Sequence, residues 1–86
     1  MKYTYKTQGV CSRSITIELE DGIIRSCEFE GGCNGNTQGI CALVQEMKAT
    51  EAIDRLEGIT CGYKSTSCPD QLARALTEIL EKEENQ

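Results

Sequence analysis

The sequence contains no histidine and no tryptophan, and only one proline among its 86 residues. Without histidine, a Ser-His-Asp triad, histidine-based acid–base catalysis and histidine-containing zinc sites are excluded. Basic residues are also few: nine against fourteen acidic ones give a net charge of −5 and a pI near 4.6. Non-specific nucleic-acid binding requires a basic face that displaces counterions, so this composition argues against it.

Long apolar runs are missing as well. No stretch approaches the roughly 18 apolar residues of a membrane helix, and the start, MKYTYKTQ, lacks the apolar run of a signal peptide. We therefore expect a cytoplasmic protein that does not enter a membrane. At 86 residues, 38% of them hydrophobic, the chain has the length for one small core, which predicts a single domain over residues 1–86.

The first third of the sequence alternates with the period of β-strands. This pattern predicts strands over Lys2–Lys6, Ser14–Glu20 and Ile23–Glu30, and Asp21-Gly22 is a strong hairpin signal. Short links between the strands indicate an antiparallel meander with one covered face. In the third strand, the alternation places Arg25, Cys27 and Phe29 on one face, and Ile24, Ser26, Glu28 and Glu30 on the other.

The remaining chain predicts two or three helices. Asn36 is a capping candidate for a helix over Thr37–Lys48, and Thr50 for a short helix through Leu56 that Gly58 would end. The fold class that we expect is α+β: an N-terminal three-stranded antiparallel meander, with the helices packed on one face. The apolar stripe of the first helix comprises Ile40, Leu43, Val44 and Met47.

The last helix carries the clearest signals. Pro69 suits the first helical position, which puts Cys68 at the cap, and Gln71 falls where the glutamine of a capping box would lie. Free backbone N–H groups at such a position stabilise a thiolate, the form that binds metal or attacks a disulfide. The alternative is that Cys68 merely replaces serine as a poor cap. The apolar stripe of this helix comprises Leu72, Leu76, Ile79 and Leu80.

Six cysteines are many for a chain of this length. In a reducing compartment they are metal ligands, redox groups or small buried hydrophobic residues more often than a disulfide framework. Cys33 lies in a Gly/Asn-rich loop, where backbone can fold around a metal–sulfur group, although its glycines could simply make the turn. Cys61 precedes Gly62 in a tight segment shortly before Cys68, and Cys11 lies between the first two strands.

We expect two roles among the cysteines. Cys27 alternates with Phe29 on a strand and Cys41 lies at the edge of a helical stripe, so both are predicted to be small buried hydrophobic residues. A tetrathiolate suits a closed structural zinc site, with an iron–sulfur cluster as the alternative cofactor. The predicted metal ligands are Cys11, Cys33, Cys61 and Cys68.

The segment Thr66-Ser67-Cys68-Pro69-Asp70 is, letter for letter, the signature that names the TSCPD domain. The likeness continues through Gln71-Leu72-Ala73 and includes Gly32-Cys33-Asn34-Gly35-Asn36 and Cys61-Gly62. Over essentially its whole length the chain resembles the short, stand-alone TSCPD proteins. The same module occurs at the C-terminus of adenosylcobalamin-dependent ribonucleotide reductases, and the resemblance implies metal binding or thiol chemistry for its cysteines.

A fainter resemblance is to U-type iron–sulfur scaffold proteins, which share the order of a meander, a helix and a cysteine at the start of a final helix. Cys33 and Cys68 would match the first and last of their three cysteines. The middle cysteine and the usual histidine of those scaffolds have no match in this sequence. We take this resemblance as a hint about the fold alone.

These observations give three hypotheses of function. The leading one is a non-catalytic zinc module that acts through a protein partner, as an accessory domain related to ribonucleotide reductase, because 86 residues cannot hold a radical-generating barrel and a nucleotide site. The second is an iron–sulfur or thiol-redox protein in which Cys61 and Cys68 form a reversible pair. The third is a structural domain with a partner-binding surface. A homodimer could also form by edge pairing of the first strand, which carries Tyr3 and Tyr5.

Overall fold

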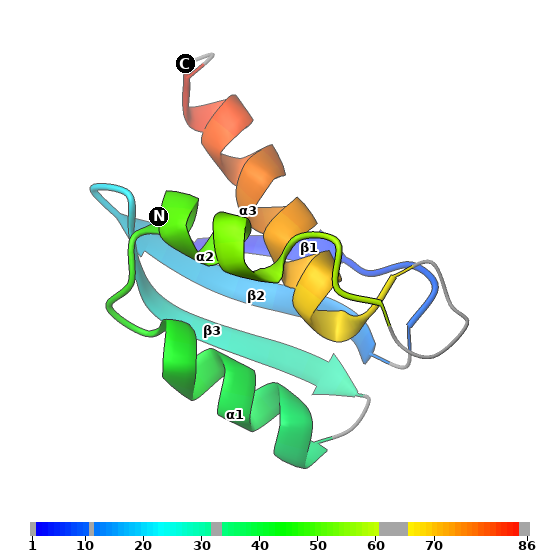
Figure 1. The fold of residues 1–86 in the computed structure, drawn as a ribbon. Coiled ribbons are helices and arrows are strands. Elements are labelled where there is room, and N and C mark those ends of the chain that lie inside the picture. The colour runs from blue at the N-terminus through cyan, green and yellow to red at the C-terminus, as the bar shows by residue number, and fades with distance from the viewer. Residues whose placement is uncertain (1, 11, 32–33, 61–65, 85–86) are drawn as a thin grey trace.

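The computed structural model describes residues 2–10, 12–31, 34–60 and 66–84 and has the α+β fold predicted from the sequence (Figure 1). Strands β1 (Lys2–Lys6), β2 (Ser12–Glu20) and β3 (Ile23–Gly31) form an antiparallel sheet in the order β1-β2-β3. Helices α1 (Asn34–Val44), α2 (Ala49–Leu56) and α3 (Cys68–Glu84) follow. Within these described ranges, every helix is too short or too polar to cross a membrane.

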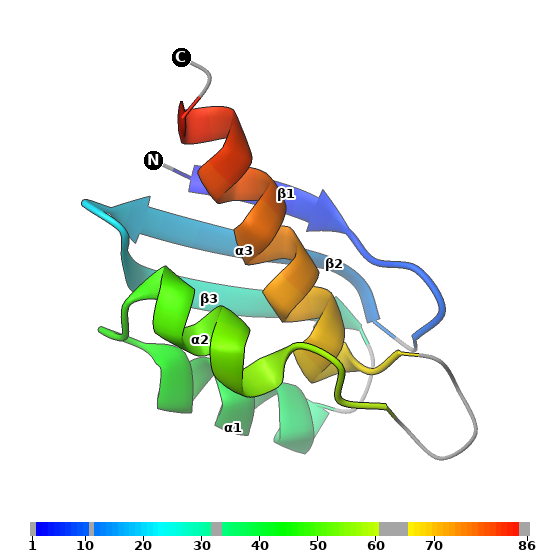
Figure 2. The same cartoon turned by 45° about the horizontal axis from the view of Figure 1, so that its top comes forward.

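The helices cover one face of the sheet. Helix α3 crosses over β1 and β2, α2 lies beside it, and α1 runs alongside β3 (Figures 1 and 2). The core forms between the inward faces of β2 and β3 and the buried sides of the three helices. Its fully buried members include Ile15, Ile17, Ile24, Ala52, Leu72, Ala75 and Leu76.

The β2–β3 hairpin closes through the predicted Asp21-Gly22 turn. Both residues have positive φ, 54° and 78°, as the tight hairpin turn with the twist of the strands requires. A β-bulge follows, because Glu18 pairs with Ser26 while Leu19 pairs with Ile24, which leaves Arg25 as the extra residue. The alternation predicted Arg25 on the same face as Cys27 and Phe29, and this prediction is wrong. The bulge instead places Ile24, which is 0% exposed, on the core face with Cys27 and Phe29.

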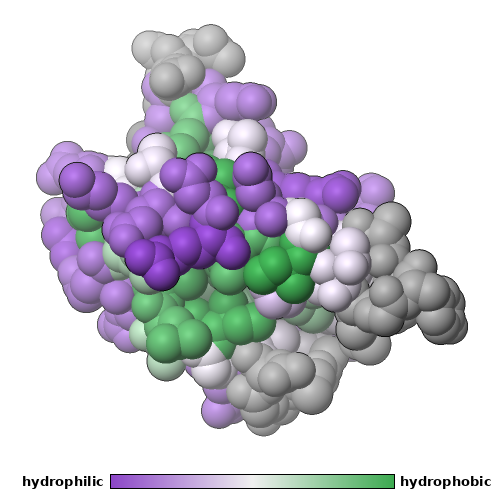
Figure 3. Space-filling model, in the orientation of Figure 1, coloured by the Kyte–Doolittle hydropathy of each residue, from purple (hydrophilic) through white to green (hydrophobic). Residues whose placement is uncertain are grey.

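Helix α1 begins earlier and ends earlier than predicted. It stops at Val44 because the chain turns back to pair with the start of β3: the N–H of Glu46, whose φ is 69°, donates to the carbonyl of Ile24 at 2.6 Å. The predicted stripe is only partly correct. Val44 is 3% exposed, whereas Leu43 is 76% exposed, and Figure 3 shows apolar surface over α1.

Helix α2 begins at Ala49, so Thr50 is not its cap. Lys48 occupies the cap position with extended backbone and no side-chain hydrogen bond. Instead, the N–H of Ala49 donates to the carbonyl of Gly22 in the hairpin turn at 2.8 Å. The end of the helix agrees with the prediction, because Gly58 follows the C-cap with a φ of 82°.

Candidate functional site

The start of α3 is capped by Ser67, one residue before the predicted cap. The Ser67 hydroxyl accepts a hydrogen bond from the N–H of Asp70 at 3.2 Å, and the Ser67 carbonyl accepts from the N–H of Gln71 at 2.8 Å. Cys68 is therefore the first residue of the helix. The cap interactions that the sequence assigned to Cys68 belong to Ser67, because serine oxygen is a much better acceptor for these amides than sulfur.

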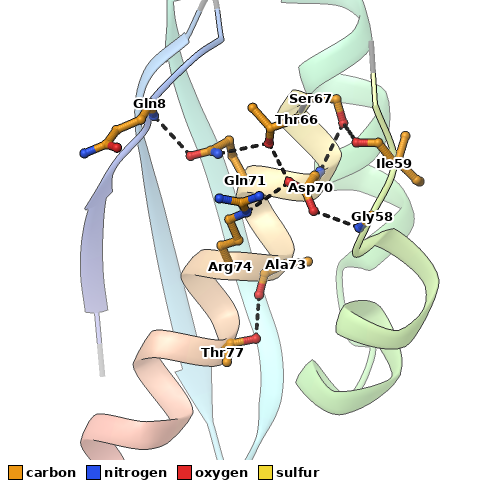
Figure 4. Close-up of polar contacts among 10 residues, drawn as sticks. All are labelled: Gln8, Gly58, Ile59, Thr66, Ser67, Asp70, Gln71, Ala73, Arg74 and Thr77. Atoms are coloured by element: carbon orange, nitrogen blue, oxygen red, sulfur yellow. Dashed lines mark hydrogen bonds and ion pairs between the residues drawn. The ribbon is translucent and has the colours of Figure 1, made fainter. Parts of the chain in front are cut away.

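The carboxylate of Asp70 is the centre of a buried hydrogen-bond network (Figure 4). It accepts from the N–H of Gly58 at 2.8 Å, from the hydroxyl of Thr66 at 2.5 Å and from Arg74 Nε at 3.0 Å. Burial raises the pKa of Asp70, but these donors outweigh burial and hold the pKa below its ordinary value. The network therefore fixes an ionised carboxylate, 4% exposed, between the end of α2 and the start of α3.

Gln71 extends this network to the other end of the chain. Its side chain is 1% exposed; Nε2 donates to the Thr66 hydroxyl at 3.0 Å, and Oε1 accepts from the N–H of Gln8 at 3.1 Å. The predicted capping-box role is wrong, because the Gln71 amide points away from the cap toward the segment after β1 (Figure 4). Gln71 thus holds the link between β1 and β2 against α3.

Cys68 is half-buried, and its Sγ lies 3.5 Å from the hydroxyl of Ser12 at the start of β2. Ser12 in turn pairs with Gly31, the last residue of β3. On the other side, the Ser67 hydroxyl donates to the carbonyl of Ile59 at 2.6 Å. Strand β2, strand β3 and the segment after α2 therefore meet at the start of α3.

Of the four predicted metal ligands, only Cys68 is among the described residues. Cys11, Cys33 and Cys61 lie outside them, and within the described ranges no group of three or more cysteine or acidic side chains could hold a metal ion. Each of the three is nevertheless close along the chain to a residue that meets the start of α3, or that pairs with such a residue. Cys11 directly precedes Ser12, and Cys33 and Cys61 follow Gly31 and Ile59 by two positions.

The structure brings together two other cysteines that were predicted to be buried separately. The Sγ atoms of Cys27 on β3 and Cys41 on α1 lie 2.8 Å apart, and both side chains are half-buried rather than enclosed. The sequence placed Cys27 on one face of a strand with Phe29, and Cys41 at the edge of a helical stripe. Their contact depends on how α1 packs against β3, for which the sequence carries no signal.

Three comparisons with known proteins complete this description. The family model described as "TSCPD domain" matches residues 1–80. None of the curated proteins and none of the solved structures compared with the chain matches it.

Proposed function

Because the chain belongs to the TSCPD domain family, which its match over 80 of 86 residues shows, we propose that it is a small zinc-binding module that acts through a protein partner. The zinc ligands in this proposal are the thiolates of Cys11, Cys33, Cys61 and Cys68. Four thiolates are the donor set of a closed structural zinc site, and no histidine is available to contribute.

The observation that carries this proposal is the meeting of chain segments around Cys68. Ser12, Gly31 and Ile59, which precede or follow the other three cysteines by one or two positions, are brought to the start of α3 by strand pairing and hydrogen bonds. These segments come from distant parts of the sequence. Their convergence supports a shared ligand for the cysteines that they carry.

The hydrogen bonds of the motif also suit a metal site. Thr66, Ser67 and Asp70 hold the start of α3 on both sides of Cys68, so that its sulfur projects from a fixed backbone. Metal ligands are commonly oriented by such supporting contacts, which reduce the entropy lost when the metal binds. In this proposal Cys68 is the metal ligand of the five-residue signature. The other four signature residues hold its backbone in place or form the start of its helix.

Metal analysis of the full chain, purified without chelator, tests the proposal. We expect about one zinc per chain and no visible absorbance, as four ligands around one tetrahedral ion require. Cys68→Ser should lose most of the zinc. The matched control is Cys41→Ser, which removes another half-buried cysteine and should retain it.

Replacement of zinc by cobalt adds a geometric test. Tetrahedral thiolate coordination should give intense visible absorption in the wild type and in Cys41→Ser, and only weak absorption in Cys68→Ser. Chains that carry no metal, or that keep their zinc after Cys68→Ser, would refute the proposal. Iron with visible absorbance would instead favour an iron–sulfur protein.

A further inference from the structure

The contact between Cys27 and Cys41 has the features of a reactive dithiol. The two sulfurs, 2.8 Å apart and both in free thiol form, share a hydrogen bond across the contact of β3 with α1. They line a hollow of about 220 Å³ together with Glu28, Phe29, Thr37 and Gln38. A small reagent can therefore reach the pair.

The two thiols differ in acidity. The hydrogen bond with Cys27 lowers the pKa of Cys41, burial opposes this, a backbone hydrogen bond at Phe29 adds to the lowering, and the charge of Glu28 opposes it. The pKa of Cys27 is raised by the hydrogen bond with Cys41 and by burial. In the fully protonated pair Cys41 donates the hydrogen bond to Cys27. When the pair loses one proton, the negative charge resides on Cys41, and Cys27 keeps its hydrogen and donates it to the Cys41 thiolate.

Charged groups near the pair are few among the described residues. Helix α1 contributes none, since its sequence NGNTQGICALV is uncharged, and β3 contributes Glu28 to the lining of the hollow. The negative charge of Glu28 favours cationic reagents over anionic ones at this hollow. The site therefore suits a small reagent with positive charge.

We propose that Cys27 and Cys41 form a thiol–disulfide exchange site that accepts a small-molecule disulfide, with Cys41 as the attacking thiolate and Cys27 as the resolving thiol. Neither residue belongs to the proposed zinc ligands, so this site is independent of the metal-binding proposal.

The exchange proceeds in two steps that balance without a further oxidant. The Cys41 thiolate attacks one sulfur of the disulfide RSSR; the S–S bond breaks, a Cys41–S–S–R bond forms, and RS⁻ leaves and takes up a proton. Cys27 then loses its proton and attacks Cys41 Sγ, which expels the second RS⁻. Two protein thiols are oxidised to one disulfide, and RSSR is reduced to two RSH.

Cystamine, a cationic small disulfide, is the probe for this reaction. The reduced full chain is incubated with it at neutral pH, free thiols are alkylated, and tryptic peptides are mapped by mass spectrometry. Residues 26–48 form one tryptic peptide that contains Cys27, Cys33 and Cys41, while Cys68 falls in the separate peptide 65–74. A second digestion, with a protease that cleaves after glutamate, cuts this peptide after Glu28 and releases Cys27 from Cys33 and Cys41 unless a disulfide joins them. Fragment ions then show which of the two cysteines is joined to Cys27.

We expect the first product to be a disulfide between Cys27 and Cys41, formed before Cys68 is modified. Cys68 is the matched control, because it is also half-buried but has a serine hydroxyl rather than a thiol beside its sulfur. Since each peptide is read separately, a failure of zinc binding leaves this readout intact. A first modification at another cysteine, or a Cys41 mixed disulfide that Cys27 does not resolve, would overturn the proposal.

Two substitutions of Cys27 separate its two roles. Cys27→Ser keeps a hydroxyl that can donate to the Cys41 thiolate but cannot resolve, so Cys41 should react at near the wild-type rate and retain one cysteamine. Cys27→Ala removes the donor as well, so the pKa of Cys41 should rise, less of it is thiolate at neutral pH, and its rate should fall by about tenfold. Equal Cys41 rates in wild type and Cys27→Ala, with both variants folded by circular dichroism, would contradict the assigned donor role.

Discussion

The carboxylate of Asp70, in the first turn of α3, accepts a hydrogen bond from the backbone N–H of Gly58, just beyond the end of α2, at 2.8 Å. Gly58 has left-handed backbone, with a φ of 82°, that ends α2. One side chain thus ties the end of one helix to the beginning of the next. Asp70 of the signature therefore has a structural role that does not depend on whether the protein binds a ligand.

Asp70→Asn should destabilise the fold by about 2 kcal/mol, because it removes the charge that is buried among donors from Gly58, Thr66 and Arg74. The free energy of unfolding from urea denaturation measures this. Asp54→Asn, at an exposed position of α2, is the control and should stay within about 0.5 kcal/mol of the wild type. Equal losses in the two variants would show that the network contributes nothing to stability.

The stability that Asp70 contributes should depend on pH in one direction. Its folded-state pKa lies below its unfolded-state value of about 3.9, so the contribution is complete above about pH 4 and is lost as the pH falls through the lower folded-state pKa. Below about pH 4 the unfolded chain takes up the proton first, which favours unfolding. Urea denaturation across this range should show the gap between wild type and Asp70→Asn narrowing with acid; a constant gap would contradict the assignment.

Gln71→Ala should cost about 2–3 kcal/mol, since it leaves the N–H of Gln8 without its acceptor and creates a cavity in a site where the side chain is 1% exposed. Thermal or urea unfolding gives the value. Gln45→Ala, at an exposed position after α1, removes the same atoms at little cost. A small loss for Gln71→Ala would mean that water replaces the amide without penalty.

Two adjacent residues of α1 should differ in how much stability is lost when their side chains are truncated. Val44→Ala removes buried methyl groups from the core and should cost about 2 kcal/mol, whereas Leu43→Ala removes a larger but 76% exposed side chain and should change stability by less than about 0.5 kcal/mol. The sequence stripe alone predicts similar losses for both. Comparable destabilisation in urea would indicate that Leu43 is covered in solution.

Removal of the proposed zinc should lower the melting temperature sharply, because structural zinc supplies on the order of 10 kcal/mol at neutral pH, comparable to the whole stability of a small domain. Scanning calorimetry of the reduced chain, with and without chelator, measures the change. Cys68→Ser should resemble the chelated wild type and respond little to chelator. Cys41→Ser should lose only about 1–2 kcal/mol and remain sensitive to chelator; unchanged melting of the chelated wild type would show that the metal is not structural.

The strands and the last helix were predictable because local rules determine them. Alternation specified β2, Asp21-Gly22 specified the hairpin, and the position of α3 followed from its apolar spacing. The errors arose where distant residues decide local structure. The end of α1 depends on the pairing of Glu46 with Ile24, and the face of Arg25 depends on a bulge that no short sequence pattern marks.

The candidate site shows the same division. The cysteines and the signature could be singled out from the sequence, and Cys68 lies close to the start of α3 as predicted. The serine cap was missed because Pro69 was taken as the first helical residue, whereas the whole first turn of a helix has N–H groups without partners and therefore tolerates proline at its second position as well. The long-range bond from Gln8 to Gln71 and the contact of Cys27 with Cys41 arise only when separate elements pack, so residue spacing could not reveal them.

The bond between Gln8 and Gln71 joins positions 63 residues apart, and the contact of Ser12 with Cys68 joins positions 56 apart. Closing such long loops costs chain entropy and slows folding. During synthesis the β2–β3 hairpin can form early, but the apolar face of β2 has no α3 to pack against until that helix has been made. A chain interrupted before Thr66 would therefore lose the α3 side of its core and the closing contacts of its site together, and a ribosome-bound chain should complete both in a single late step.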